Sequence, residues 1–184
     1  DALAFKARAE ELGAGVGAGS SLDSTTATLS ALPGKLEPSL ALFADMVRRP
    51  RFADADIARL KKQWLAGIAQ EKSDPESMAN RLLPPLLYGE GHPYAIPFSG
   101  TGTEASIAAI GRADLVAFGH DWLRPDNATV IVAGDIGMAD AVALLNKHFG
   151  DWKTEGSAPK KTIAEVAPSN RARVYLVDKP GAIQ

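Results

Sequence analysis

The stretch between residues 52 and 77, FADADIARLKKQWLAGIAQEKSDPES, constrains the fold most, because its apolar residues recur at three- and four-residue steps. That spacing is typical of an amphipathic helix, whose apolar side chains lie on one face. Two aspartates fall in the first turn, where the helix dipole favours negative charge. Pro75 is expected to end the helix, because the residue before a proline is pushed out of helical geometry. The residues predicted to share the buried face are Ile57, Leu60, Trp64, Leu65 and Ile68.

Composition excludes several classes of protein. The net charge of −2 gives no electrostatic case for nucleic-acid binding. No apolar run approaches the roughly 20 residues that a membrane-spanning helix needs. The chain has no cysteine, so disulfides, thiolate catalysis and cysteine-ligated zinc are excluded. An apolar content of 46% is ordinary for a globular domain.

The remaining elements predict an α+β fold with an antiparallel sheet and helices packed on one face. Two short strands joined by a turn at residues 21–24 suit a hairpin, and a proline pair at residues 84–85 is expected to bend or interrupt the helix that carries it. The β-branched run at 127–134 is the strongest candidate for a further strand. Other helices are predicted over 1–12, 36–47, 75–89 (opened by Pro75), 103–110, 112–123 and 138–149, the hairpin strands over 15–20 and 25–32, and a last strand over 173–178.

The polar composition near the end of the chain predicts a division into domains. We expect a first α+β domain over residues 1–152, an inter-domain linker over 153–172, and the first strand of a second, truncated domain over 173–184. The chain opens inside a helical pattern and stops just after a strand. Both ends therefore suggest a piece of a longer polypeptide.

Several short segments resemble the insulinase/pitrilysin family of zinc metallopeptidases, which includes the mitochondrial processing peptidases, and they follow one another in the family's order. The run LGAGVGAGSSLDSTTATLSAL resembles the family's substrate-edge hairpin N-A-x-T-S-x-D-x-T, with Gly17 in the place of the asparagine and with Ala18, Asp23 and Thr25 matching. The runs YGEGHPYAIPFSGTGTEASIAAI, DLVAFGHDWLRPDNATVIVAGDI and HFGDW resemble later family segments.

The resemblance also implies that this chain has lost its zinc ligands. Catalytic members carry H-x-x-E-H and a glutamate helix close to E-R-x-V-x-L-x-E. The matching run here is LKKQWLAG, so the two glutamate positions are occupied by Leu60 and Gly67, neither of which binds zinc. H-x-x-E-H is absent from these residues, and the resemblance places it before Asp1. The family's substrate-holding arginine–tyrosine pair would lie beyond Gln184.

The resemblance therefore implies a non-catalytic domain that helps to form a peptide-binding chamber. The implied partners are an unfolded peptide substrate and a catalytic half or subunit that carries H-x-x-E-H and the zinc; this chain is expected to bind no metal or cofactor. The alternatives are an active full-length peptidase whose chemistry lies in another segment, and a purely scaffolding subunit that has lost proteolysis. The sequence does not identify the compartment; bacterial periplasm and cytoplasm are the two expectations, with the periplasm slightly favoured. The predicted substrate-binding residues are Gly17, Ala18, Gly19, Ser20 and Ser21.

Other candidate sites are weaker than this interpretation. The three histidines, His92, His120 and His148, are not clustered as zinc ligands are. The glycine-rich runs at residues 13 and 100 lack the strand before and helix after that a dinucleotide fingerprint needs. The acidic residues Glu71, Asp74 and Glu76 are expected to form a solvated face, with no neighbour that would perturb them.

Overall fold

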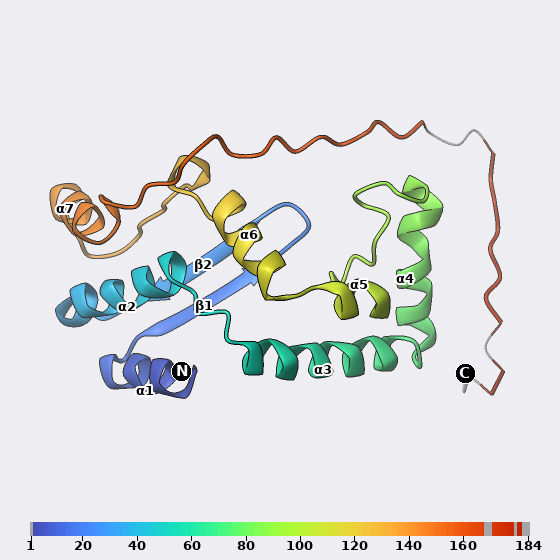
Figure 1. Ribbon diagram of the computed structural model, residues 1–184, viewed down its shortest axis with the longest axis horizontal. Helices are drawn as coiled ribbons and strands as arrows, with labels where there is room; N and C mark the ends of the chain where they lie inside the picture. The colour runs from blue at the N-terminus through green and yellow to red at the C-terminus, as the bar shows by residue number, and fades with distance from the viewer. Residues whose placement is uncertain (1, 168–170, 179, 182–184) are drawn as a thin grey trace. The chain divides into compact units, whose positions relative to one another are not determined.

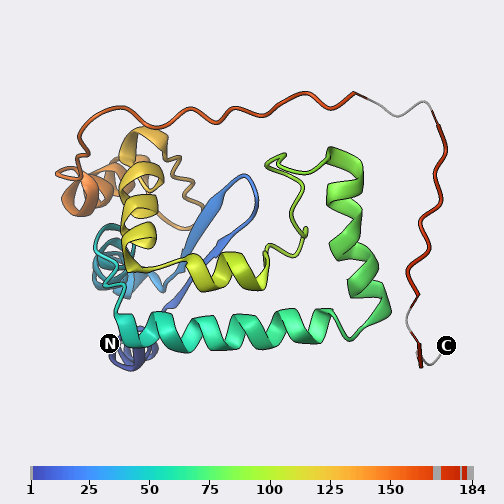
Figure 2. The same cartoon turned by 45° about the vertical axis from the view of Figure 1, so that its right-hand side comes forward.

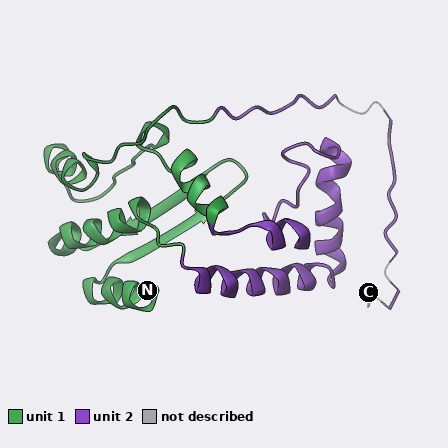
Figure 3. Cartoon of the chain, viewed as in Figure 1, with its two compact units in different colours: residues 1–52, 113–159 green, residues 53–112, 160–184 purple. Residues whose placement is uncertain are grey.

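The computed structural model describes residues 2–167, 171–178 and 180–181, and it confirms the α+β class (Figure 1). The chain divides into two compact units, residues 1–52 with 113–159 and residues 53–112 with 160–184 (Figure 3). The described elements are α1 Ala2–Leu12, β1 Gly15–Ser20, β2 Thr25–Ser30, the 3₁₀ turn Pro33–Lys35, α2 Leu36–Arg48, α3 Asp54–Glu71, α4 Pro75–Tyr88, α5 Glu104–Ala109, α6 Arg112–Trp122, the 3₁₀ turn Pro125–Asn127 and α7 Met138–Phe149. The expected domain boundaries at residues 152 and 172 stay a prediction.

The first unit is built on α2, which contacts α1, β2 and α7. Its small buried core joins these elements through alanine and leucine side chains. Phe43 of α2 meets the ring of Phe149 of α7 edge-on, with ring centroids 6.3 Å apart. Arg48 ties the two helix ends together, because it donates to the carbonyl oxygen of His148 and pairs with Asp151, 2.6 and 2.8 Å away. The buried apolar residues of this unit are Ala9, Leu12, Leu40, Ala44 and Ala141.

Strands β1 and β2 form the predicted antiparallel hairpin (Figure 1). The register pairs Gly15 with Ser30 and Ser20 with Thr25. Ser21 closes the turn, because its main-chain N–H donates to the carbonyl oxygen of Ser24 over 2.8 Å and its hydroxyl accepts from the N–H of Ser24 over 3.2 Å. Within the described part of the chain, β1 and β2 pair only with each other.

The second unit consists of α3, α4, α5 and the loops between them. α5 lies alongside α3 in both views (Figures 1 and 2). Lys61 donates to the main-chain carbonyl oxygens of Ala108 and Ile110, both 2.8 Å away. Further along α3, Lys72 pairs with Glu104 at the first turn of α5 over 2.5 Å. These contacts at opposite ends show that the two helices run antiparallel.

The helical segment predicted over 52–77 is shorter than expected. α3 ends at Glu71, and Pro75 opens α4, which confirms the prediction that a further helix starts there. Asp74 caps α4 by accepting from the N–H of Ser77 over 2.8 Å. A proline in the first helical turn costs no hydrogen bond, so a new helix starts there readily.

Of the two predicted effects of the proline pair, interruption of the helix is wrong, because α4 continues through both residues. Pro84 and Pro85 both lie inside the helix, and Pro84 is fully buried. Burial of the apolar ring offsets the lost helical hydrogen bond. Because a proline has no N–H, the carbonyl oxygens of Asn80 and Arg81 lack their usual helical donors.

The two later strands are absent: neither 127–134 nor the described part of 173–184 forms a ladder. Ile131, at the centre of the β-branched run, is 88% exposed. A strand requires a partner for its main-chain groups. The β-branched pattern indicates that a segment suits a strand, but a ladder also requires a second strand beside it.

Candidate functional site

One face of α3 carries the two positions where the family pattern places glutamates. Leu60, Trp64, Gly67 and Glu71 follow one another at steps of four, three and four residues, so they lie on one side of the helix. Leu60 is 47% and Trp64 is 45% exposed, so the prediction that they are core residues is wrong for the described chain. A side chain at Gly67 would meet nothing within 4 Å. This face is open, and neither Leu60 nor Gly67 offers a ligand atom.

Two of the three histidines, His92 and His120, make side-chain contacts with neighbouring residues. The ring of His92 stacks on Tyr88 with centroids 5.1 Å apart and accepts the N–H of Tyr94 at Nδ1. Nδ1 of His120 lies 2.9 Å from the neighbouring Asp121. No group of three or more histidine, aspartate or glutamate side chains in the described residues is arranged to hold a metal ion. That the chain binds no metal stays a prediction.

The polar centre of the second unit is an ion pair between Arg81 of α4 and Glu71 at the end of α3. The Arg81 side chain is 11% exposed. It also donates to the hydroxyl of Thr101 over 2.8 Å and to the carbonyl oxygen of Gly102 over 2.5 Å. Thr101 in turn donates to Glu71 over 2.9 Å. We call Glu71, Arg81, Thr101 and Gly102 the Arg81 cluster.

The cluster sets the charge state of Glu71. Partial burial disfavours the carboxylate, but the hydrogen bonds from Arg81 and Thr101 outweigh burial, so the pKa of Glu71 lies below its ordinary value of 4.5. The sequence interpretation of a solvated acidic face is therefore wrong for Glu71, and Asp74 serves as a helix cap. No sequence pattern around Glu71 identifies Arg81 as its ion-pair partner, because Arg81 follows ten residues later and lies in another helix.

Beside the Arg81 cluster lies a hollow of about 370 Å³. We call it the Arg81 pocket. Its walls come from the end of α3, the first turns of α4 and the loop before α5. It is lined by Glu71, Ser77, Asn80, Arg81, Phe98 and Ser99.

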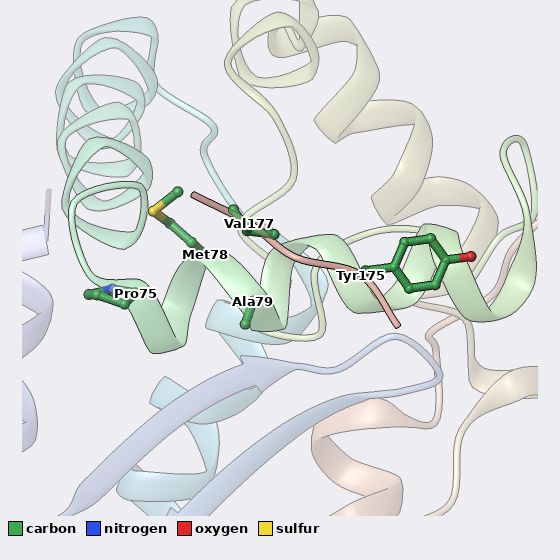
Figure 4. Close-up of a pocket in the computed structure, with 5 residues that line it drawn as sticks. All are labelled: Pro75, Met78, Ala79, Tyr175 and Val177. Atoms are coloured by element: carbon green, nitrogen blue, oxygen red, sulfur yellow. The ribbon is translucent and has the colours of Figure 1, made fainter. Parts of the chain in front are cut away.

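A second hollow, of about 220 Å³, lies where the extended segment near the end of the chain passes the start of α4 (Figure 4). Met78 and Val177 point toward this space, whereas the ring of Tyr175 extends away from Met78. Its remaining walls are Pro75 and Ala79. This space is lined mainly by apolar side chains, without the cluster of polar groups found at Arg81.

The predicted substrate-binding residues lie together on the hairpin. Gly17, Ala18, Gly19 and Ser20 belong to β1, and Ser21 begins the turn. The last four of the five residues are exposed. A side chain at Gly19 would meet nothing within 4 Å, whereas one at Gly17 would lie 3.3 Å from the Thr28 hydroxyl.

Two family models match the chain. The insulinase (peptidase family M16) model matches residues 1–97, which is more than half of the chain, and the model of the peptidase M16 inactive domain matches residues 109–183. An α+β domain with both matches defines the class of protein: the chain belongs to the insulinase family, peptidase family M16, and it is a non-catalytic domain of that family.

Relatives from bacteria agree with this assignment. An uncharacterised zinc protease of Mycobacterium leprae is 33% identical over 71% of this chain, and the uncharacterised zinc protease YmxG of Bacillus subtilis is 26% identical over 65%. The chain spans only 29% and 28% of the lengths of these two proteins.

Solved structures show the same fold. The peptidase M16 inactive domain from Pseudomonas fluorescens has a TM-score of 0.82 and 35% identity, and the match covers 91% of this chain and 40% of that one. The first half of the periplasmic protease PqqL from Escherichia coli has a TM-score of 0.64 at 20% identity, covering 81% of this chain and 32% of that one. This second match shows the fold alone.

Proposed function

We propose that this chain is the peptide-holding part of an M16 peptidase and that proteolysis is carried by a half or partner subunit bearing H-x-x-E-H. The observation that carries the proposal is the open face of α3, where Leu60 and Gly67 occupy the two glutamate positions. Zinc needs several ligands held in one geometry, and an aliphatic side chain and a glycine provide none. The zinc of the complete enzyme therefore belongs to the catalytic half.

The edge of β1 is the proposed contact with the peptide. An extended peptide adds to a free strand edge through main-chain hydrogen bonds. The N–H of Ser21 points toward β2, because it donates to Ser24. Main-chain groups alternate in direction along a strand. The main-chain N–H and C=O groups of Gly17 and Gly19 therefore also point toward β2. The groups offered to a peptide are therefore those of Val16, Ala18 and Ser20.

A cross-strand contact supports this alternation. The hydroxyls of Ser20 and Thr25 lie 3.0 Å apart. Side chains approach each other most closely at pairs whose main-chain groups point outward. Ser20 belongs to such a pair, and Ala18, two residues earlier, has the same orientation.

The test is a pair of hairpin variants. Ala18→Pro removes an outward N–H, which an edge strand tolerates, and Gly19→Ala is the control, because its new methyl group meets nothing within 4 Å. Anisotropy of a fluorescein-labelled unfolded peptide measures capture. We expect Ala18→Pro to weaken capture about tenfold with an unchanged circular dichroism spectrum, and Gly19→Ala to bind like the parent chain. No capture by the parent chain would favour the purely scaffolding alternative.

We further propose that the complete protein acts in the periplasm with a catalytic half. The support is the fold shared with PqqL, a periplasmic protease whose first half has been solved separately. In the described part of the chain, no helix has the length and apolar character to span a membrane. Fractionation of the native host, with antibody detection, tests the compartment. Co-purification of an H-x-x-E-H-bearing polypeptide tests the partner.

A further inference from the structure

The hydrogen bonds within the Arg81 cluster determine which donors and acceptors of the Arg81 pocket are left for a ligand. Thr101 has one hydroxyl proton, and it goes to Glu71. The oxygen of Thr101 lies 2.9 Å from that of Ser99, so Ser99 is the donor in this contact. The Ser99 hydroxyl therefore has only acceptor sites left to offer to a ligand.

Arg81 has the complementary surplus. A guanidinium group has five N–H donors. Both hydrogens of Nη1 are used, by Glu71 and Thr101, and one hydrogen of Nη2 is used by Gly102. Within the described residues, the Nε–H and the second Nη2–H have no hydrogen-bond partner. Since the side chain is only 11% exposed and lines the pocket, these donors favour a ligand that brings an acceptor.

Two further lining residues, Asn80 and Phe98, add an amide and an aromatic ring to the pocket. The side chain of Asn80 is exposed and makes no hydrogen bond with the described residues, so both its donor and its acceptor are available. Phe98 packs edge-on against Tyr88, with centroids 6.2 Å apart, and remains 50% exposed. Its free surface suits one apolar side chain.

Charge restricts the ligand further. Glu71 and Arg81, which both line the pocket, neutralise each other as an ion pair. A charged ligand is attracted by one member of this pair and repelled by the other, and it gains little for its lost hydration. Uncharged groups with both a donor and an acceptor match the pocket best.

We propose that the Arg81 pocket binds one uncharged peptide unit, with its carbonyl oxygen on Arg81, its N–H on Ser99 or Asn80, and an apolar side chain against Phe98. This deepens the proposed function, on which its biological meaning rests: the pocket selects a neutral, apolar residue of the captured peptide. In this proposal the hairpin edge binds the main chain of the peptide whatever its sequence. The Arg81 pocket then determines which side chain of the peptide is preferred.

The test uses three small probes and ¹H–¹⁵N spectra of the 184-residue chain. N-acetyl-leucinamide has two amides and an apolar side chain, N-acetyl-leucine carries a carboxylate, and N-acetyl-lysinamide carries a cation. We expect the neutral probe to shift the resonances of Asn80, Phe98 and Ser99 with a millimolar dissociation constant, as suits a ligand of about a dozen atoms. The two charged probes are expected to bind at least about fivefold more weakly.

Variants locate the effect. Asn80→Ala is expected to weaken binding of N-acetyl-leucinamide by roughly three- to tenfold, which corresponds to one lost hydrogen bond. Alanine suits a helix, so α4 is retained. Asn146→Ala, at an exposed asparagine of α7 in the other unit, is the matched control and is expected to change nothing.

The outcomes separate this inference from the proposed function. Shifts confined to other residues, or equal binding of all three probes, overturn the pocket assignment even if the labelled peptide is captured at the hairpin. Pocket shifts by N-acetyl-leucinamide without capture of the longer peptide support the pocket and overturn the proposed function. Loss of binding in Asn146→Ala as well as Asn80→Ala also counts against the pocket.

Discussion

The indole N–H of Trp64 donates a hydrogen bond to the main-chain carbonyl oxygen of Thr101, 3.1 Å away, although the Trp64 side chain is nearly half exposed. This bond joins the open face of α3 to the loop that contributes Thr101 and Gly102 to the Arg81 cluster. The main contribution of the Trp64 side chain is therefore this hydrogen bond to the loop, and not the filling of a buried core.

Trp64→Phe is therefore expected to lower the free energy of unfolding by about 1 kcal/mol, since a phenyl ring retains apolar contact but has no donor. Urea denaturation measures the loss. Trp122→Phe is the control, because the Trp122 indole N–H has no bond partner in the described part of the chain. Equal losses in both variants would show that ring size, and not the bond to Thr101, causes the change.

The purified chain is expected to retain no zinc after dialysis against trace metal. Leu60 and Gly67 cannot ligate, and the described histidines and carboxylates form no cluster of three. Restoring only the glutamates, in the double variant Leu60→Glu with Gly67→Glu, is expected to leave the zinc content near zero, because two carboxylates do not complete a zinc site. Mass spectrometry of the metal measures this. One tightly held zinc per parent chain would mean that the assignment of the two glutamate positions is wrong.

Glu71 is expected to make stability depend on pH. Its pKa in the folded chain is lower than 4.5, so it contributes stability above that pH, and the contribution is lost as the pH falls through the folded pKa. Glu71→Gln is expected to cost about 2 kcal/mol at pH 7, the size of a hydrogen bond to a charged group. It should also flatten the loss of stability between about pH 5 and pH 3.

Urea midpoints at several pH values measure this effect, with Glu10→Gln as the control, since Glu10 is an exposed residue of α1 paired only with Lys6 at 3.8 Å among the described residues. If the stability of Glu71→Gln depended on pH as steeply as that of the parent chain, another carboxylate would be the cause of the loss of stability at acid pH.

Local patterns predict much of the fold. Helices α2 and α7 and strand β1 lie where the spacing and the turn residues place them, because each is specified by side chains close in sequence. The β-branched content of 127–134 favours a strand, yet a strand also depends on a neighbour. The sequence position of Pro84 favours a break in α4, but burial outweighs its missing N–H.

The same distinction separates the two candidate sites. Leu60 and Gly67 are seven residues apart, so helical spacing predicts that they share a face. The Arg81 cluster joins α3, α4 and a loop twenty residues further on, and no local pattern contains that information. In the sequence, Glu71 resembles one member of a solvated acidic group, because its partner is identified only by the packing of the chain.

Arg124 is expected to hold the segment after α7 in place, and its loss should expose that segment to protease. The side chain is 2% exposed. Its Nε and Nη2 atoms donate hydrogen bonds to the two carboxylate oxygens of Asp126 over 2.9 and 3.0 Å. The remaining donors reach the carbonyl oxygens of Glu155 and Gly156 over 2.9 and 2.8 Å.

Arg124→Lys keeps the charge but cannot make this forked set of bonds. Trypsin cleavage after Lys153 is therefore expected to be several-fold faster in Arg124→Lys than in the parent chain, while the helical circular dichroism signal is retained. Arg49→Ala, which removes an exposed arginine paired within α2 to Asp45, is the control. If both variants were cut at the parental rate, residues 153–156 would be held by contacts other than Arg124; if both were cut faster, general loosening of the first unit would be the cause.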